Sequence, residues 1–331
     1  AESDLADGGL EPLTSLRSAF MPLSLCFSFI SNLRYSRSRV KLRRWCEGGA
    51  ETNVVSKQMR DLWAASPVMP AIPPVEDLPA ERNARDRRTI AAFPILDGVA
   101  AERVTCDGVA AVWYRPADAL QGRVLLYIHG GAFIWSSAEG HCGVISRVAA
   151  ASCAKTLALD YGLAPENPFP GPLNEAVRLY KWMLEAGYAP GSIAMVGDSA
   201  GGGLVLSAMM RLRAEGVPLP ACGVIASAYA DLTNSGESID WVTMDPCVTR
   251  EGLAACGEAY LQGHDASDPL ASPVFGDFGG FPPLLIQVGS RERLLSDSLR
   301  VAAKADANGV AVRLEVYDGC VHLWHWWAPP A

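Results

Sequence analysis

The stretch Ile-Ala-Met-Val-Gly-Asp-Ser-Ala-Gly at residues 193–201 carries an apolar run that ends in a serine between glycines. Residues 193–196 predict a buried strand, and residues 200–214 predict a helix. The last five residues of the stretch fit the G-x-S-x-G nucleophile elbow, which lies at a strand-to-helix turn. A serine on so tight a turn has strained backbone angles, and glycine neighbours relieve the crowding. The stretch therefore predicts an α/β fold with Ser199 as a nucleophile.

Strand-like apolar runs alternate with helix-length segments on both sides of this turn. The predicted strands are residues 102–106, 109–115, 124–128, 156–160, 193–196, 222–228, 284–288 and 312–316. The predicted helices are residues 142–152, 173–185, 200–214, 250–261 and 294–307. Asp107-Gly108 predicts a hairpin between the first two strands. Such alternation indicates a mostly parallel sheet covered by helices on both faces.

The two ends of the chain differ in character. Residues 1–90 contain proline-rich breaks without strand alternation, and we expect an N-terminal arm and helical cap there rather than part of a sheet. Residues 91–331 form the predicted catalytic domain. Within it, residues from about 230 to 280 lack a strand pattern and follow a strand. We expect this insertion on the cap side of the site, because ligands of open α/β sheets bind at the carboxyl ends of strands.

Composition excludes several classes of function. The net charge of −8 disfavours a nucleic-acid partner, because phosphate binding needs a clustered positive surface. The nine cysteines are scattered without metal-ligand spacing, so we expect reduced thiols in a cytoplasmic protein, with no disulfide framework and no metal. We expect a monomer or a homodimer.

An apolar stretch at residues 19–33 is followed by six basic residues. It is too short and too interrupted to span a bilayer. Membrane contact through an interfacial helix within residues 19–44 is one interpretation. We favour the other, an arm that lies in solvent or against the cap, since apolar and basic runs also occur on ordinary protein surfaces.

A serine hydroxyl needs donors that stabilise the oxyanion formed when it attacks a carbonyl. His129-Gly130-Gly131-Ala132-Phe133 follows the predicted strand 124–128 and matches the HGGG-type loop that supplies such donors. We predict that the backbone N–H groups of Gly130, Gly131 and Ala200 form the oxyanion hole. We interpret His129 as structural.

A general base must follow the last strand, because the triad order in this architecture is serine, acid, histidine. His322 follows the strand 312–316 and is our choice. His325 is the rival, while His141 and His264 fit less well because they precede the acid segment or the elbow.

The acid is expected in the loop after strand 284–288, where a carboxylate accepts a hydrogen bond from the imidazole and fixes its tautomer. Glu292 is our choice. Asp297 is the second candidate, although a residue inside the next helix is carried away from the site. Asp268 is weaker, because it precedes the strand.

Taken together, these motifs resemble the hormone-sensitive-lipase family of esterases within the α/β-hydrolases. The resemblance runs in order from about residue 90 to 325. Its motifs are HGGAF at 129–133, LDYGLAPENPFP at 159–170, GDSAGGG at 197–203, DPLASP at 268–273, G-x-x-E-x-L at 289–294 and G-x-x-H at 319–322.

The resemblance implies an α/β-hydrolase fold with an N-terminal cap. It implies a catalytic triad of Ser199, Glu292 and His322, an oxyanion hole as above, activity on short- to medium-chain acyl esters, and no metal or organic cofactor. From their positions in the motifs, Phe133, Trp135 and Tyr161 are hypothesised to line an apolar substrate pocket.

The sequence departs from the family at several positions. Gly162 and Asn167 replace the usual arginine and histidine of one motif, and Arg291 replaces an acidic residue beside Glu292. Only nine residues follow His322, and the first 60 residues match the family poorly.

Two other functions remain as alternatives. The same triad serves lactone or amide hydrolysis, and residues alone do not separate these from ester hydrolysis. A non-catalytic small-molecule binder, as in the plant gibberellin receptors that resemble the family but lack the histidine, is disfavoured because serine, acid and histidine are all present.

Overall fold

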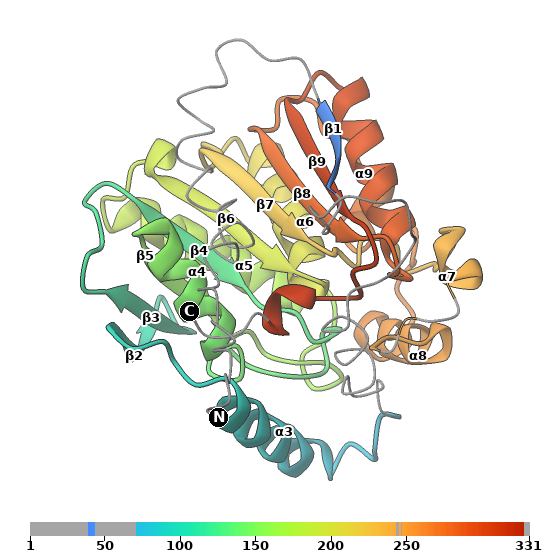
Figure 1. The fold of residues 1–331 in the computed structure, drawn as a ribbon, viewed down its shortest axis with the longest axis horizontal. Helices are drawn as coiled ribbons and strands as arrows, with labels where there is room; N and C mark the ends of the chain where they lie inside the picture. Colours follow the sequence, from blue (N-terminus) through green and yellow to red (C-terminus); the bar gives the residue numbers. More distant parts are fainter. Residues whose placement is uncertain (1–38, 44–70, 243–244, 246, 328–331) are drawn as a thin grey trace, which may run out of the picture.

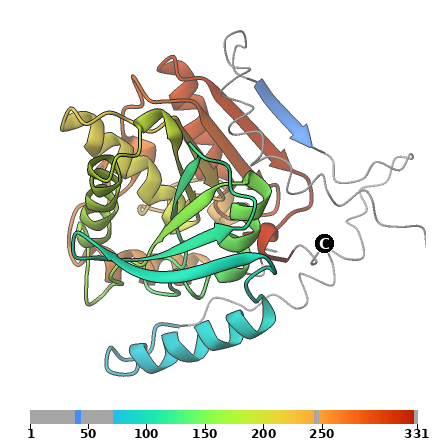
Figure 2. The same ribbon diagram turned by 90° about the vertical axis from the view of Figure 1, so that its left-hand side faces the viewer.

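One mixed sheet organises the molecule. The computed structural model describes residues 39–43, 71–242, 245 and 247–327. Within these residues nine strands form a single sheet in the order β1-β9-β8-β7-β6-β4-β5-β3-β2 (Figures 1 and 2). Neighbouring strands are parallel except in the β2–β3 and β3–β5 pairs. The sheet is therefore mostly parallel, as the sequence predicts.

The central strands are apolar because both of their faces are covered. Every residue of β4, β6 and β8 is buried, as expected for parallel strands between two helical layers. The strands are β1 Arg39–Arg43, β2 Val99–Cys106, β3 Val109–Pro116, β4 Val124–Ile128, β5 Lys155–Leu159, β6 Ile193–Asp198, β7 Cys222–Ala226, β8 Leu284–Gly289 and β9 Val312–Tyr317.

The helices follow the strands along the chain. They are α3 Leu78–Ala92, α4 Cys142–Ser152, α5 Gly171–Glu185, α6 Ala200–Ala214, α7 Ser238–Trp241, α8 Arg250–Leu261 and α9 Leu295–Ala307. Short 3₁₀ turns are η3 Pro190–Ser192, η4 Pro273–Phe275 and η5 Trp324–Trp327.

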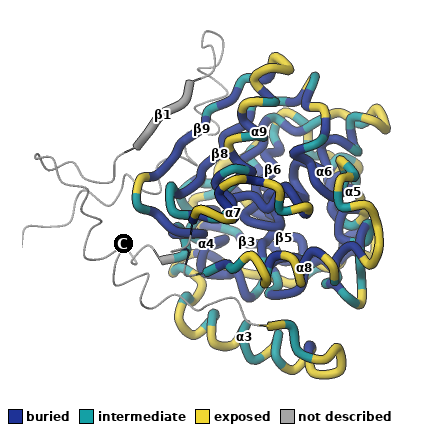
Figure 3. Tube along the Cα trace, turned by 90° about the vertical axis from the view of Figure 1, so that its right-hand side faces the viewer, coloured by how far each residue is buried: buried dark blue, intermediate teal, exposed yellow. Residues whose placement is uncertain are grey.

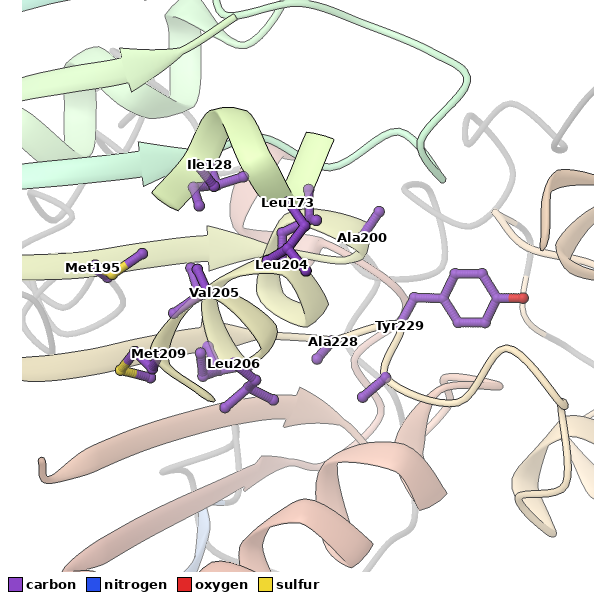
Figure 4. Close-up of a cluster of buried hydrophobic side chains, with 14 of the residues drawn as sticks. Ile128, Leu173, Met195, Ala200, Leu204, Val205, Leu206, Met209, Ala228 and Tyr229 are labelled. Carbon is purple, nitrogen blue, oxygen red and sulfur yellow. The ribbon is translucent and has the colours of Figure 1, made fainter. Parts of the chain in front are cut away.

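Alternation along β4 separates the two faces of the sheet. Leu126 and Ile128 join the large core cluster that contains the apolar residues of α5, α6 and α9, whereas Leu125 and Tyr127 join the cluster of α4. Side chains of α6 such as Val205 pack in the first cluster (Figure 4). Exposed positions lie in loops, on the outer sides of the helices and along the edge strand β2 (Figure 3).

The hairpin β2–β3 forms at the predicted turn. Cys106 pairs with Val109, and Asp107 and Gly108 between them have φ of 49° and 74°. Positive φ at both central residues is the geometry of the tight turns whose twist matches antiparallel strands.

Our expectation that residues 1–90 contribute nothing to the sheet is wrong. β1 pairs in parallel with β9, with Arg39 opposite Arg313 and Arg43 opposite Tyr317. The segment does alternate, with Val40 and Leu42 between basic residues, but it is only five residues long. Its basic residues continue the apolar and basic run of residues 19–44. Its strand character is not visible locally, because it depends on pairing with β9.

The strand β1 also argues against an interfacial helix that reaches residues 39–43. The rest of the predicted membrane-contact segment, residues 19–38 and 44, lies outside the described residues, as does the apolar stretch 19–33. In the part of the chain that the structure describes, every helix is too short or too polar to cross a bilayer.

The predicted site residues follow strands β4, β5, β6, β8 and β9. These five strands run parallel in one sheet, so their carboxyl ends meet at the same edge. Figure 1 shows that edge facing α7 and α8.

Candidate active site

Ser199 lies at the turn between β6 and α6. Its backbone has φ of 50° and ψ of −121°, values that residues other than glycine rarely adopt. The Ser199 N–H donates to the Ala226 carbonyl at 2.9 Å, which ties the turn to the end of β7. A Cβ at Gly201 would lie 2.0 Å from the Ile128 carbonyl oxygen, so only glycine fits two residues after the serine. The geometry matches the strained turn predicted for a nucleophile elbow.

His322 lies in the loop that follows β9. Its Nε2 is 3.1 Å from the Ser199 Oγ, and both side chains are almost fully buried. Hydrogen-bonding distance between an imidazole and a hydroxyl allows the imidazole to take the proton as the oxygen attacks.

Glu292 lies in the loop after β8 and is fully buried. Its Oε2 is 2.9 Å from His322 Nδ1. Its Oε1 accepts hydrogen bonds from the Ser227 hydroxyl at 2.7 Å and from the Gly289 N–H at 2.6 Å. These contacts fix the carboxylate, which in turn fixes the ring so that Nδ1 carries the proton and Nε2 faces the serine.

The carboxylate also sets the electrostatics of the imidazole. Burial lowers the pKa of His322, but the hydrogen bond and the charge of Glu292 outweigh burial and hold this pKa above its ordinary value. Burial raises the pKa of Glu292, and the hydrogen bonds that it accepts oppose the increase. Glu292 therefore favours the protonated imidazole that forms during proton transfer.

The rival residues lie elsewhere. The His325 ring lies tilted against Trp324 with ring centroids 3.8 Å apart, and burial lowers the pKa of His325 to about 4. The Asp297 carboxylate accepts from the backbone N–H groups of Ala230 and Asp231, at 2.9 and 3.0 Å. Asp268 accepts from an N–H in its own loop. The structure therefore brings Glu292 and His322, and not these rivals, to Ser199.

The predicted oxyanion loop begins where β4 ends. Gly131 has φ of 111°, and its carbonyl accepts from the N–H groups of Ile134 and Trp135 in a tight turn. Among the described residues, the N–H groups of Gly130 and Gly131 have no hydrogen-bond acceptor. Ala200 is the first residue of α6, where N–H groups have no partner in the helix and the helix dipole favours negative charge. All three predicted donors thus flank the serine turn or the end of the adjacent strand β4.

His129 is buried behind this loop. Its Nδ1 lies 2.7 Å from the Gly130 carbonyl oxygen, and burial lowers the pKa of His129 to about 3, which keeps the ring neutral. These contacts support its predicted structural role.

The three predicted pocket residues are buried and have different neighbours. Tyr161 donates its hydroxyl to the His129 carbonyl at 3.0 Å and stacks on the His129 ring. Phe133 stacks on Tyr260 with centroids 3.9 Å apart. The Arg85 guanidinium lies over the Trp135 ring. Contact with substrate stays a prediction for all three, and the Tyr161 contacts show that its hydroxyl supports the oxyanion loop.

Sequence reasoning missed Ser227. We predicted a strand through residue 228, but β7 ends at Ala226, and Ser227 has φ of 50°. This turn directs the Ser227 hydroxyl to Glu292. The available signal was a polar residue, Ser227, near the end of the strand next to the elbow. Apolar residues on both sides of Ser227 made the strand look longer than it is.

Comparison with known proteins places this geometry in a family. A family described as alpha/beta hydrolase fold matches residues 125–326. The acetyl-hydrolase of Streptomyces hygroscopicus is 41% identical over 239 residues, which cover 72% of this chain and 80% of that protein.

Solved structures agree with this placement. An esterase from the bacterial hormone-sensitive lipase family is 38% identical, with a TM-score of 0.77 over 84% of this chain and 94% of that one. EstE5, in a crystal soaked with p-nitrophenyl butyrate, is 37% identical, with a TM-score of 0.77 over 84% of this chain and 93% of that one. The predicted fold class and the predicted resemblance are therefore confirmed. The chain belongs to the hormone-sensitive-lipase family of α/β-hydrolases, and it is a carboxylic ester hydrolase.

Proposed function

We propose that the protein hydrolyses short- to medium-chain acyl esters by a two-step mechanism in which Ser199 becomes acylated. The observation that carries the proposal is the continuous contact from Ser199 Oγ to His322 Nε2 at 3.1 Å and from His322 Nδ1 to Glu292 Oε2 at 2.9 Å. A nucleophile, a base and an orienting acid in this order are the requirements for acyl transfer.

In the first step, Ser199 Oγ attacks the ester carbonyl carbon while its proton passes to His322 Nε2. The carbonyl oxygen becomes an oxyanion that the N–H groups of Gly130, Gly131 and Ala200 stabilise. The tetrahedral intermediate then collapses, the bond to the alcohol oxygen breaks, and His322 returns the proton to the leaving alcohol.

In the second step, water attacks the acyl-enzyme carbonyl and gives a proton to His322 Nε2. Collapse of the second tetrahedral intermediate releases the carboxylic acid and returns the proton to Ser199 Oγ. Glu292 stays ionised throughout and stabilises the protonated His322.

The preference for short acyl groups is supported by the 41% identical relative from Streptomyces hygroscopicus, which is named an acetyl-hydrolase. Bulky aromatic side chains follow the oxyanion glycines and pack tightly, since Phe133 stacks on Tyr260 and lies 6.2 Å from the Tyr229 ring. If these rings line the acyl pocket, as predicted for Phe133, their tight packing leaves more room for small acyl groups than for long ones.

We also propose that α3 belongs to an N-terminal cap, from which the sheet strand β1 is excepted. Residues 230–280, with α7 and α8, form the opposite rim of the site. Contacts support this division. Arg82 of α3 donates to the carbonyl of Ile134 in the oxyanion loop at 2.8 Å, and Asp86 of α3 accepts from the Ser137 hydroxyl at 2.6 Å.

The first prediction tests the nucleophile and the acyl group together. For Ser199→Ala we expect a loss of about 10⁶-fold in kcat, because the remaining groups cannot form an acyl-enzyme. For the unchanged protein, we expect kcat/KM to be highest for p-nitrophenyl acetate or butyrate and to fall from octanoate to decanoate.

Retention of ester hydrolysis by Ser199→Ala would disprove the mechanism. A maximum at decanoate would disprove the acyl-length proposal alone. Faster hydrolysis of a matched anilide or lactone would instead favour the alternative substrate classes.

A further inference from the structure

A second buried carboxylate lies next to the serine, and the proposed mechanism does not use it. Asp198 directly precedes Ser199 and is 3% exposed. Its Oδ1 accepts from the Tyr127 hydroxyl at 2.8 Å, and its Oδ2 faces His141 Nε2 at 3.4 Å. Both partners come from segments outside the nucleophile elbow. Asp198 therefore links the nucleophile turn to other parts of the site.

His141 connects this carboxylate to the oxyanion loop. The ring lies just before α4 and is 2% exposed. Its other nitrogen, Nδ1, is 2.8 Å from the Ser136 hydroxyl. With a proton on Nε2, the ring donates to Asp198 while Nδ1 shares a hydrogen bond with the Ser136 hydroxyl, so both nitrogens have partners. Ser136 follows the turn that begins at Gly131, and its φ is 73°.

The carboxylate lies directly against the predicted oxyanion donors. A Cβ added to Gly130 would lie 2.5 Å from Asp198 Oδ2 and 3.0 Å from the Ser199 Cβ. A shift of the Asp198 side chain toward Gly130 would therefore press on the backbone of the oxyanion loop.

The charge of Asp198 makes its orientation important. Burial alone would raise the pKa of Asp198, but His141 and the Tyr127 hydroxyl outweigh burial and hold this pKa below its ordinary value. A buried anion beside a forming oxyanion opposes catalysis unless donors neutralise it and hold it in place.

The ring of His141 is held from two further sides. The His129 ring lies 5.1 Å away, and the Trp326 ring approaches edge-on at 4.3 Å. Trp326 belongs to η5, which follows His322 closely in the chain. The nucleophile turn, the oxyanion loop and the segment that carries the base thus all meet at His141.

We propose that His141 is a positioning residue that holds the oxyanion loop in register with the nucleophile turn by joining Ser136 to Asp198. The proposal rests on the proposed function, in which Gly130, Gly131 and Ala200 stabilise the oxyanion. It assigns no contact with substrate to His141.

The experiment compares four variants by kcat and KM for p-nitrophenyl acetate. His141→Phe removes both polar contacts, Ser136→Ala removes only the contact to the oxyanion loop, and His141→Gln retains an amide N–H near the position of Nε2. Ile145→Val is the control, because Ile145 lies on the same helix and is fully buried but belongs to an apolar cluster.

We expect His141→Phe to lower kcat about 100-fold with little change in KM, since loss of one oxyanion donor costs about 10²- to 10³-fold. Ser136→Ala should lower kcat about tenfold, and His141→Gln should recover part of the loss. Ile145→Val should keep the kcat of the unchanged protein even if its unfolding temperature falls.

A second readout separates positioning from general destabilisation. A small alkylboronic acid adds to the serine oxygen and places a boron-bound oxygen among the oxyanion donors. We expect its inhibition constant to rise in Ser136→Ala and His141→Phe by a factor similar to the loss in kcat/KM, while circular dichroism confirms folded protein.

The outcomes are distinct. If Ser199→Ala keeps activity, the proposed function fails. If Ser199→Ala is inactive but Ser136→Ala and His141→Phe keep kcat and boronate affinity within twofold, only the positioning role is disproved. Should His141→Phe fail to fold, Ser136→Ala still tests the positioning role. A tenfold loss of kcat would support this role, and a kcat within twofold of the unchanged protein would disprove it.

Discussion

Two buried carboxyl groups, Glu292 and Asp297, lie close together in the sequence after β8, yet their partners differ. Glu292 accepts from His322, Ser227 and Gly289. Asp297 is the first-turn acidic residue of α9 and accepts only backbone N–H groups of the segment after β7 among its described hydrogen bonds. The geometry assigns an orienting role to the first and a structural role to the second.

This difference gives a prediction at the residue scale. We expect Glu292→Gln to lower kcat by about 10³- to 10⁴-fold, because an amide in place of the carboxylate favours the wrong imidazole tautomer and does not stabilise the protonated ring. Asp297→Asn should keep kcat within a few-fold, since an amide oxygen still accepts the same two N–H groups. Steady-state kinetics on p-nitrophenyl butyrate measure both.

The reverse pattern, with Asp297→Asn inactive and Glu292→Gln active, would show that Asp297 is the acid. Equal losses in both variants would point to a general structural effect and contradict the assignment of separate roles.

The sequence predicted most of the candidate site at this scale because each motif residue is fixed by chemistry or by backbone shape. Ser199, the oxyanion glycines, His322 and Glu292 all follow strand ends, where the fold brings them together. Ser227 and the contact of His141 with Asp198 were not predicted. Each depends on a side-chain direction between segments far apart in the chain, which spacing alone does not reveal.

At the scale of elements, Arg82 joins α3 to two of the loops around the site. The Arg82 guanidinium donates to the carbonyls of Ile134 and Ala164 and forms an ion pair with Glu166, and its side chain is 13% exposed. Each carbonyl belongs to a loop that follows a central strand. Hydrogen bonds from a charged donor to buried carbonyls are among the stronger ones in proteins.

We therefore expect Arg82→Ala to lower the free energy of unfolding by about 1–3 kcal/mol and to reduce kcat/KM, because the oxyanion loop loses a support. Arg88→Ala is the matched control on the same helix. Its side chain is 67% exposed and contacts Glu81 in solvent, so its removal should change stability by less than about 0.5 kcal/mol.

Urea denaturation of both variants, with kinetics on the same preparations, checks this prediction. Indistinguishable behaviour of Arg82→Ala and Arg88→Ala would mean that α3 is not needed to support the loop.

The predicted elements agree best where a segment carries its own boundary signals. Helices α4, α6 and α8 have the bounds that the sequence predicts, and α8 begins after Thr249, whose hydroxyl caps the helix by accepting from the Gly252 N–H. Strand β1 was missed because five residues with one partner strand give little local signal. Long-range pairing, rather than propensity, determines such a strand.

At the scale of the whole molecule, protonation of the buried Asp297 carboxyl makes the free energy of unfolding depend on pH. Burial raises the pKa of Asp297 to about 8, and the charge of Asp231 adds to this effect, while backbone N–H groups and Arg300 oppose it. In the unfolded chain the same group ionises near pH 3.9, so between about pH 4 and pH 8 the native state holds more protons.

The free energy of unfolding should therefore fall as pH rises through this range, by up to about 1.4 kcal/mol per pH unit for this group. In Asp297→Asn, which cannot ionise, the decline should be shallower. Asp240→Asn is the control, because Asp240 is exposed and pairs with Arg250 at the surface. Denaturation curves at pH 5, 7 and 9 measure the slopes, and parallel slopes in wild type and Asp297→Asn would contradict the assignment.

Other predictions for the whole molecule stay open to measurement. They are a monomer or homodimer, a cytoplasmic location, and an N-terminal cap that excludes the sheet strand β1. Analytical ultracentrifugation would measure the oligomeric state, and cell fractionation would test the location.

The pairing of β1 with β9 also has a consequence for the order of events during synthesis. Arg39 lies opposite Arg313, so β1 leaves the ribosome long before its partner has been translated. Until then β1 has no edge to join, and β8 ends the nascent sheet with unpaired N–H and C=O groups that invite association with other chains. Since His322 follows β9, the triad is complete only after β9 has been translated, and a chaperone that shields β8 in that interval should raise the yield of active protein.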